Sequence, residues 1–277
     1  MKYTRNEFLR LAGISGAAAL TAAGAWAKTS TLPKVNFKLG LTSYTLRNFK
    51  IDEVIRMTRR LGLESISLKS MHMPLESSED ELKQIAGTVR NAGLNLYGAG
   101  VIYMKTPQEV ESTFKYAAHA GLEMIIGVPN HELLSLVNEQ VKKYNIKLAI
   151  HNHGPGDTLY PSPDDVYEKI KNLDQRIGLC IDIGHVVRLG QDPAAMLERY
   201  QDRFYDMHMK DADKANPEGQ PIEVGRGIID IPKIMETLKK VNYGGNVAFE
   251  YEKNAEDPLA GLAESVGYVR GVIRMIG

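Results

Sequence analysis

The sequence predicts a single α/β domain of the (β/α)8 type, a TIM barrel, over residues 35–277. Eight short apolar runs recur at intervals of roughly 25 to 30 residues, as expected for repeated β-α units. Helical patterns with a period of 3.6 residues lie between these runs. No Gly-x-Gly-x-x-Gly turn follows the first run, which argues against a dinucleotide-binding sheet. Eight units in about 240 residues fit a closed barrel.

The predicted strands are short and bounded by polar residues. We place them at 38–43, 65–68, 94–98, 124–128, 147–151, 177–182, 205–210 and 246–250. Four helix starts are marked by a capping residue followed by proline, at Thr106-Pro107, Ser162-Pro163, Asp192-Pro193 and Asp257-Pro258. The polar stretch 211–227 is the longest predicted loop, and in a barrel such a loop often covers the substrate.

Composition limits the classes of partner. The chain has 277 residues, of which 43% are hydrophobic and 25% charged, as in ordinary globular proteins. Lys and Arg number 34, as do Asp and Glu, so there is no basic surplus that would favour nucleic acid or an anionic membrane. The single cysteine, Cys180, lies in an apolar run, and we expect it to be an inert core residue.

Residues 1–27 have the composition of an export signal. Lys2, Arg5 and Arg10 precede an uncharged run of small and apolar residues, which ends in the cleavage pattern Ala25-Trp26-Ala27. The start resembles a twin-arginine signal, although Asn6 stands where the second arginine belongs. We expect export to the periplasm or beyond, with no stable membrane insertion once the signal is removed. The alternative, a retained membrane anchor, is less favoured because the run is short.

Metal-ligand side chains stand at the ends of the last four predicted strands: His151, Asp182, His208 and Glu250. Each residue alone would be an ordinary structural feature. In a barrel, however, the carboxyl ends of the strands converge, and carboxylates brought together there repel one another unless a cation lies between them. We therefore expect one divalent metal ion. The mixed nitrogen and oxygen ligands favour Mn or Zn, with Co, Fe or Mg as alternatives.

Further polar residues neighbour the proposed ligands. His153, His185 and Lys210 are candidates for substrate contact and proton transfer, and the alternative for each is support of a ligand. Candidate substrate-binding residues at strand ends or in loops are Tyr44, Lys69, His72, Arg226 and Glu252.

Four short motifs, in this order, resemble the xylose isomerase-like barrel superfamily, which includes sugar phosphate isomerases and epimerases and the second family of AP endonucleases. They are Asp182-x-Gly-His, His208-x-Lys-Asp, the loop Gly225-x-Gly-x-x-Asp230 and Phe249-Glu250. The resemblance covers essentially the whole mature chain. It implies metal ligands at the ends of strands five to eight, a Glu250 that is both ligand and catalytic base, and a small-molecule sugar substrate.

One position departs from the family pattern. Isomerases and epimerases of the family usually carry Glu-Asn-His at the end of strand five, where this chain has His151-Asn152-His153. The pair of glutamates that moves protons on opposite faces of a sugar is then incomplete. His-x-His-Gly resembles the inosose dehydratase branch. We expect a metal-dependent sugar isomerase or epimerase-like enzyme working through an enediolate, with a β-eliminating lyase of a 3-keto sugar as the alternative.

Two other functions are weighed against this one. An endonuclease IV-like phosphodiesterase needs three metals and histidines at strands two and three, but the third predicted strand ends in Tyr97-Gly98-Ala99-Gly100. A metal- or sugar-binding barrel without catalysis is the non-enzyme alternative. No P-loop is present and Lys and Arg do not cluster at the predicted mouth, so we expect a sugar without phosphate. An oligomer remains open.

Overall fold

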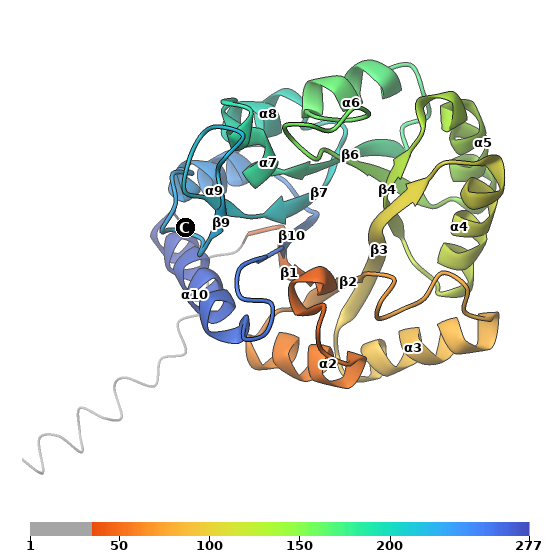
Figure 1. Cartoon of the computed structure of the whole chain (residues 1–277), viewed down its shortest axis with the longest axis horizontal. Helices are drawn as coiled ribbons and strands as arrows, with labels where there is room; N and C mark the ends of the chain where they lie inside the picture. Colours follow the sequence, from red (N-terminus) through yellow and green to blue (C-terminus); the bar gives the residue numbers. More distant parts are fainter. Residues whose placement is uncertain (1–34, 277) are drawn as a thin grey trace, which may run out of the picture. The chain divides into compact units, whose positions relative to one another are not determined.

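A computed structural model describes residues 35–276 and contains the predicted closed barrel (Figure 1). Neighbouring barrel strands pair in parallel in the order β1-β10-β7-β6-β5-β4-β3-β2. The strands are β1 Lys38–Thr42, β2 Ser65–Leu68, β3 Asn95–Met104, β4 Met124–Pro129, β5 Lys147–His151, β6 Ile177–Asp182, β7 Phe204–Met209 and β10 Asn246–Phe249. The proposed export signal lies outside the described residues.

Helices surround the barrel (Figure 1). The α-helices are α2 Ile51–Arg60, α3 Glu79–Asn91, α4 Pro107–His119, α5 Leu134–Tyr144, α6 Pro163–Ile170, α7 Ile183–Arg188, α8 Pro193–Arg199, α9 Ile231–Lys240 and α10 Leu259–Ile276, and the 3-10 helices are η1 Ser43–Leu46 and η2 His131–Leu133. Among the described helices, none is long and apolar enough to span a membrane.

Capping residues start the helices largely as the sequence predicts. Thr106 and Ser162 each accept a hydrogen bond from the backbone three residues on, and Asp192 caps α8. Proline fixes the backbone at the first turn of each of these helices. At Asp257-Pro258 the helix begins one residue later than predicted, at Leu259, and Pro258 instead accepts the first helical hydrogen bond through its carbonyl.

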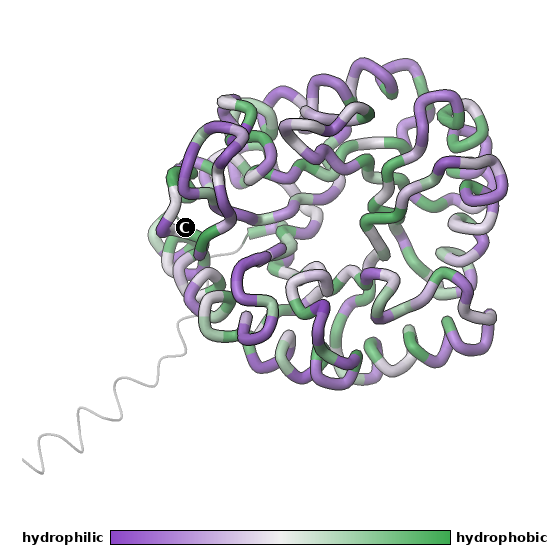
Figure 2. The backbone as a smooth tube through the Cα atoms, in the orientation of Figure 1, coloured by the Kyte–Doolittle hydropathy of each residue, from purple (hydrophilic) through white to green (hydrophobic). Residues whose placement is uncertain are grey.

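The strands contribute many of the buried residues of the hydrophobic core. Their apolar side chains are buried between barrel and helices, and hydrophobic residues follow the strands and the inner faces of the helices (Figure 2). A second, smaller cluster includes Tyr97, Met124 and Cys180 from β3, β4 and β6. Cys180 is 1% exposed and unpaired, so its prediction as a buried thiol is confirmed.

Two segments differ from the sequence prediction. Strand β3 continues past Gly100 to Met104, because Gly100 allows β3 to approach β4 closely: a β-carbon there would lie 2.2 Å from the carbonyl oxygen of Ile126. The predicted loop 211–227 contains a two-stranded antiparallel sheet of β8 Asp211–Ala212 and β9 Pro221–Ile222.

Candidate functional site

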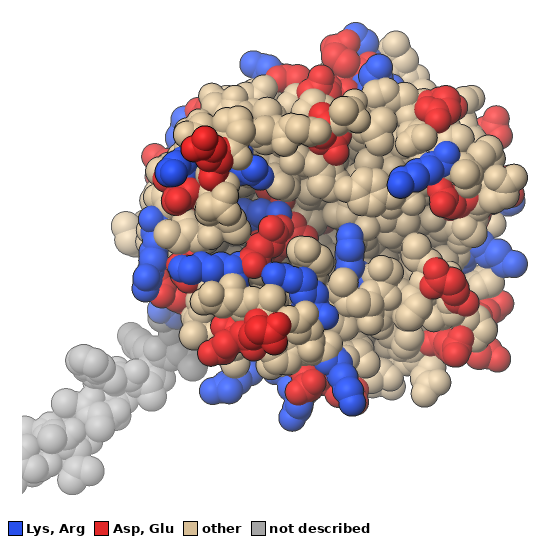
Figure 3. All heavy atoms as spheres, in the orientation of Figure 1, with Lys and Arg blue, Asp and Glu red and all other residues tan. Residues whose placement is uncertain are grey.

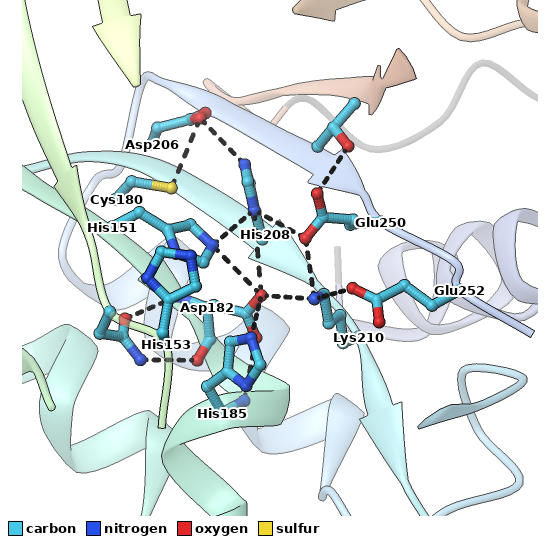
Figure 4. Close-up of polar contacts among 12 residues, drawn as sticks. His151, His153, Cys180, Asp182, His185, Asp206, His208, Lys210, Glu250 and Glu252 are labelled. Atoms are coloured by element: carbon cyan, nitrogen blue, oxygen red, sulfur yellow. Dashed lines mark hydrogen bonds and ion pairs between the residues drawn. The ribbon is translucent and has the colours of Figure 1, made fainter. Parts of the chain in front are cut away.

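The structure brings together the four side chains proposed as metal ligands (Figure 4). His151 ends β5, Asp182 ends β6, His208 lies in β7, and Glu250 directly follows β10. All four are buried. Parallel pairing sets Asp182 beside His208 and His208 beside Ala248, so the strand register itself aligns the ligands at the carboxyl end of the barrel.

The distances between the four groups fit a single ion. His151 Nε2 lies 2.9 Å from His208 Nδ1 and 3.4 Å from Asp182 Oδ2, and His208 Nδ1 lies 3.1 Å from Glu250 Oε2. All four ligand atoms lie within 4.8 Å of one another. Bonds of about 2.0–2.2 Å to nitrogen and oxygen place neighbouring ligand atoms about 3 to 3.6 Å apart. One ion with these four ligands is therefore geometrically reasonable.

One buried oxygen supports the same interpretation. Asp182 Oδ2 is buried without a hydrogen-bond partner among the described residues, although the ammonium of Lys210 lies 3.0 Å away. Unsatisfied buried groups are costly, and a common explanation for them is an ion. Asp182 is held in place through its other oxygen, which accepts a hydrogen bond from the backbone amide of His185 at 2.9 Å. Its Oδ2 is directed at the ligand cluster, 3.4 Å from His151 Nε2 and 3.9 Å from His208 Nδ1.

Lys210 provides positive charge beside the ligands. Its Nζ lies 2.8 Å from Glu250, 3.0 Å from Asp182 and 2.5 Å from Glu252. Burial opposes the charged form of Lys210, but these carboxylates hold its pKa well above the usual range. Burial likewise opposes ionisation of Glu250, whereas Lys210 and His208 hold the pKa of Glu250 well below its usual range.

His153 and His185 lie beside the ligands and are partly open to solvent. The ring of His153 is 4.4 Å from that of His151, and its Nε2 is 2.9 Å from the hydroxyl of Tyr103. The ring of His185 lies 5.9 Å from that of His153. Burial lowers the pKa of His185 to about 4 and lowers the pKa of His153 as well. Both rings can therefore contact a molecule bound over the ligands.

The proposed substrate-binding residues separate into two groups. Lys69 donates to the carbonyl of Val101 at 2.8 Å and lies 5.7 Å from the ring centre of Tyr44. Burial lowers the pKa of Lys69, while the charge of Glu250 opposes this shift. Glu252 reaches the site through Lys210. In the space-filling view, acidic and basic side chains meet near the centre of this face (Figure 3).

The other two candidates make structural contacts. His72 is 5% exposed, and its ring nitrogens lie 2.8 Å from Ser43 Oγ and 3.0 Å from the carbonyl of Phe49. Arg226 forms a bidentate ion pair with Glu264 of α10. In these conformations neither side chain has an unoccupied group directed at the ligand cluster.

Sequence reasoning missed two residues that contact the ligands. Thr42 at the end of β1 donates to Glu250 Oε1 at 3.0 Å. Asp206 lies within β7, 3.8 Å from His208 Nε2, and burial raises its pKa to about 6. The signal for Thr42 was its place at a strand end. The signal for Asp206 was that a charged residue stands within an apolar strand, two residues before a proposed ligand.

The fold and this site define a TIM barrel with a buried His/Asp/His/Glu cluster at the carboxyl ends of its strands. The family model for the xylose isomerase-like TIM barrel matches residues 132–271 of the 277, and this chain belongs to that family. The matched segment contains all four proposed ligands.

The curated relatives match only about half of this chain, and at low sequence identity. The chain is 27% identical over 157 residues to the rhizopine catabolism protein MocC of Rhizobium meliloti, covering 47% of this chain and 48% of that protein. It is 25% identical over 136 residues to inosose dehydratase of Lacticaseibacillus casei, covering 44% and 45%. The chain thus spans about half the length of these curated relatives. The structure of 3-keto-D-glucoside 4-epimerase YcjR from E. coli has a TM-score of 0.69 at 16% identity, covering 85% of this chain and 99% of that one, and shares the fold.

Proposed function

We propose that this chain is a divalent-metal-dependent enzyme that removes a proton from the carbon beside the carbonyl of a keto-sugar, in the manner of sugar isomerases and epimerases. The observation that carries the proposal is the set of four ligand atoms at 2.9–3.9 Å from their neighbours, with Glu250 among them. Asp182, His208, His151 and Glu250 would hold the ion. When bound, it would polarise the carbonyl and stabilise the negative charge that proton removal creates.

Glu250 is the residue that we assign to proton removal. Thr42 and Lys210 fix its two oxygens, at 3.0 Å and 2.8 Å, so the carboxylate has a defined orientation. Lys210 and His208 keep the pKa of Glu250 low despite burial, so its carboxylate is in the ionised form that a base needs. A base fixed in this way is the arrangement that general base catalysis requires.

A second candidate reaction, β-elimination, is favoured by His151. An imidazole stands where isomerases and epimerases of this family usually have their second glutamate, so a proton cannot be exchanged on both faces of the sugar by two carboxylates. In elimination, Glu250 takes the proton and the electron pair of the broken C–H bond forms a C=C bond. The hydroxyl on the next carbon leaves and takes up a proton, which solvent supplies through the neutral ring of His153 or His185, forming water. The similarity to inosose dehydratase supports this candidate.

The test uses metal-loaded protein and a 3-keto glycoside in deuterium oxide. We expect deuterium at the carbon beside the carbonyl, observed by NMR and mass spectrometry, and we expect Glu250→Gln to suppress it by at least about 100-fold, within the range for general base catalysis. Glu264→Gln on α10 is the matched control, because Glu264 has 41% of its side chain exposed and pairs with Arg226 and not with a proposed ligand. Absence of both exchange and a dehydrated product in the wild-type protein would refute the proposed proton removal for this substrate class.

The product distinguishes the two candidates. Loss of water from the keto-sugar identifies elimination, whereas return of the deuteron to the same carbon skeleton identifies isomerisation by one base. Rapid 3-epimerisation of unmodified fructose or tagatose by the wild-type protein would show that His151 does not prevent two-base chemistry, and the elimination candidate would then be rejected.

A further inference from the structure

A buried polar group lies directly beneath the metal ligands. Asp206 is two residues before His208 on β7, so both side chains point into the barrel. Asp206 is fully buried, and its Oδ2 lies 3.8 Å from His208 Nε2 (Figure 4). From the other side, the hydroxyl of Tyr97 on β3 lies 3.2 and 3.3 Å from its two oxygens, and Cys180 Sγ lies 3.7 Å away. Tyr97 and Cys180, from two other strands, thus fix this carboxylate.

The two nitrogens of His208 face different partners. Nδ1 faces the ligand cluster, 2.9 Å from His151 Nε2 and 3.1 Å from Glu250 Oε2. Nε2 points the opposite way and, among the described residues, is buried without a hydrogen-bond partner. An imidazole that ligates a metal through Nδ1 must carry its proton on Nε2, and the partner of that N–H determines which tautomer forms. For His208, the carboxylate that faces Nε2 is Asp206.

We propose that Asp206 is a positioning residue that accepts the Nε2–H of His208 and so keeps Nδ1 free for the metal. This inference rests on the metal site of the proposed function. Asp206 does not touch the ion or the substrate. Its effect passes through His208, and Tyr97 supports it by donating to the carboxylate from the far side of the barrel. The N–H···O bond forms if the 3.8 Å separation closes by about 1 Å.

The alternative is that Asp206 only fills the barrel interior, and metal affinity separates the two roles. We expect Asp206→Asn to weaken zinc binding, measured by chelator competition, by about 10- to 100-fold, the usual effect of removing such a partner. Tyr97→Phe should cause a smaller loss, because the carboxylate remains but loses one donor. Ser65→Ala is the control: Ser65 Oγ is buried and unpartnered in β2, and its removal should leave affinity within twofold of wild type.

A spectroscopic measurement reports the tautomer directly. In zinc-loaded wild-type protein labelled with 15N-histidine, we expect the His208 proton on Nε2, with a proton shift typical of a strong hydrogen bond to a carboxylate. In Asp206→Asn this shift should move upfield. A merely structural Asp206 would leave the tautomer and the shift unchanged.

The outcomes are separable. If the wild-type protein binds no divalent metal, the proposed function fails and this inference fails with it. If the wild-type protein binds zinc but folded Asp206→Asn binds it within twofold as tightly, only the inference is overturned. If Asp206→Asn does not fold, Tyr97→Phe and the wild-type spectrum decide: unchanged affinity in Tyr97→Phe, or a proton on Nδ1 of His208 in the zinc protein, overturns the inference.

Discussion

Lys210 and the carboxylates around it form a buried charge group at the strand ends. Asp182 and Glu250 lie within 3.0 Å of its ammonium nitrogen, and both are also proposed metal ligands. The ammonium and a divalent ion therefore compete for the same oxygens. Removal of Lys210 should therefore destabilise the metal-free protein much more than the metal-loaded protein.

We predict that Lys210→Met destabilises the metal-free protein strongly. Two carboxylates would be left buried without their cation, which typically costs about 3–5 kcal/mol and lowers Tm by roughly 10 °C in a domain of this size. Saturating zinc should remove most of the deficit, because the ion replaces the lost charge. Thermal unfolding with EDTA and with zinc measures both effects.

Lys240→Met is the control for this prediction. Lys240 pairs with Glu198 on the surface with 66% of its side chain exposed, so its loss should change Tm little. An EDTA-treated Lys210→Met protein that melts at the wild-type temperature would contradict the assigned charge balance.

The sequence predicts the positions of some site residues but not the contacts that others make. His151, Asp182, His208 and Glu250 were predictable because each ends or follows a recognisable strand, and a barrel brings such ends together. His72 also follows a strand, yet its ring is occupied by Ser43 and Phe49, contacts that depend on tertiary packing. No local pattern encodes such contacts.

The segment that follows β7 is organised by one carboxylate. Asp211 Oδ2 accepts hydrogen bonds from the amides of Gly225 at 2.9 Å and Gly227 at 3.0 Å, and its Oδ1 accepts from Ile229 at 3.2 Å. A β-carbon on Gly227 would lie 2.1 Å from Asp211 Oδ1, so glycine is required for this close approach. The family motifs His-x-Lys-Asp and Gly-x-Gly-x-x-Asp are thus two halves of one contact.

We predict that Asp211→Ala loosens this segment without unfolding the barrel. Losing several hydrogen bonds to a charged acceptor should cost about 2–4 kcal/mol of unfolding free energy. Amides of 225–229 should exchange with solvent at least tenfold faster, while amides of β5 and β6 keep their protection. Denaturant unfolding and hydrogen exchange with mass spectrometry measure these effects.

Asp213→Ala is the control for this prediction. Asp213 lies in the same hairpin, and its side chain accepts one hydrogen bond, from the backbone amide of Gln220 at 2.7 Å. We expect it to change stability by less than about 1 kcal/mol. Wild-type exchange of the 225–229 amides in Asp211→Ala would rule out the organising role of this carboxylate.

The sequence predicts the strands that are compact apolar runs, but not the full extent of β3 or the pair β8 and β9. Seven of the eight barrel strands lie within a residue of the predicted bounds at both ends, because each is a compact apolar run. The exception, β3, continues beyond its predicted end, because Gly100 permits close contact with β4. The pair β8 and β9 has two residues per strand, too few for any alternation to appear.

For the complete chain, we propose export and predict a mature N-terminus near Lys28. The cleavage pattern Ala25-Trp26-Ala27 after an uncharged run motivates this prediction. Edman sequencing of protein isolated from the periplasm or medium of the native cell should begin within a few residues of Lys28. Recovery of a chain that starts at Met1 from the cell interior would contradict it.

Metal binding should stabilise the barrel as a unit. The proposed ligands come from β5, β6, β7 and the end of β10, four neighbours in the closed sheet, so one ion joins half of its strands. A ligand that binds only the folded state at 100 times its Kd adds about 2.7 kcal/mol. For a domain of this size, that gain raises Tm by about 5–10 °C.

We therefore predict that EDTA lowers the Tm of the purified protein by about 5–10 °C, that zinc or manganese restores it, and that elemental analysis finds about one ion per chain. Asp182→Ala and His208→Ala should remain folded, as judged by circular dichroism, but lose both the ion and the response to EDTA. Ser65→Ala keeps all four ligands and should respond as wild type does. Full metal content in both ligand variants would place the ion elsewhere. A wild-type Tm that EDTA leaves unchanged, despite a bound ion, would show that the strand ends are held equally well by Lys210 and its carboxylate partners alone.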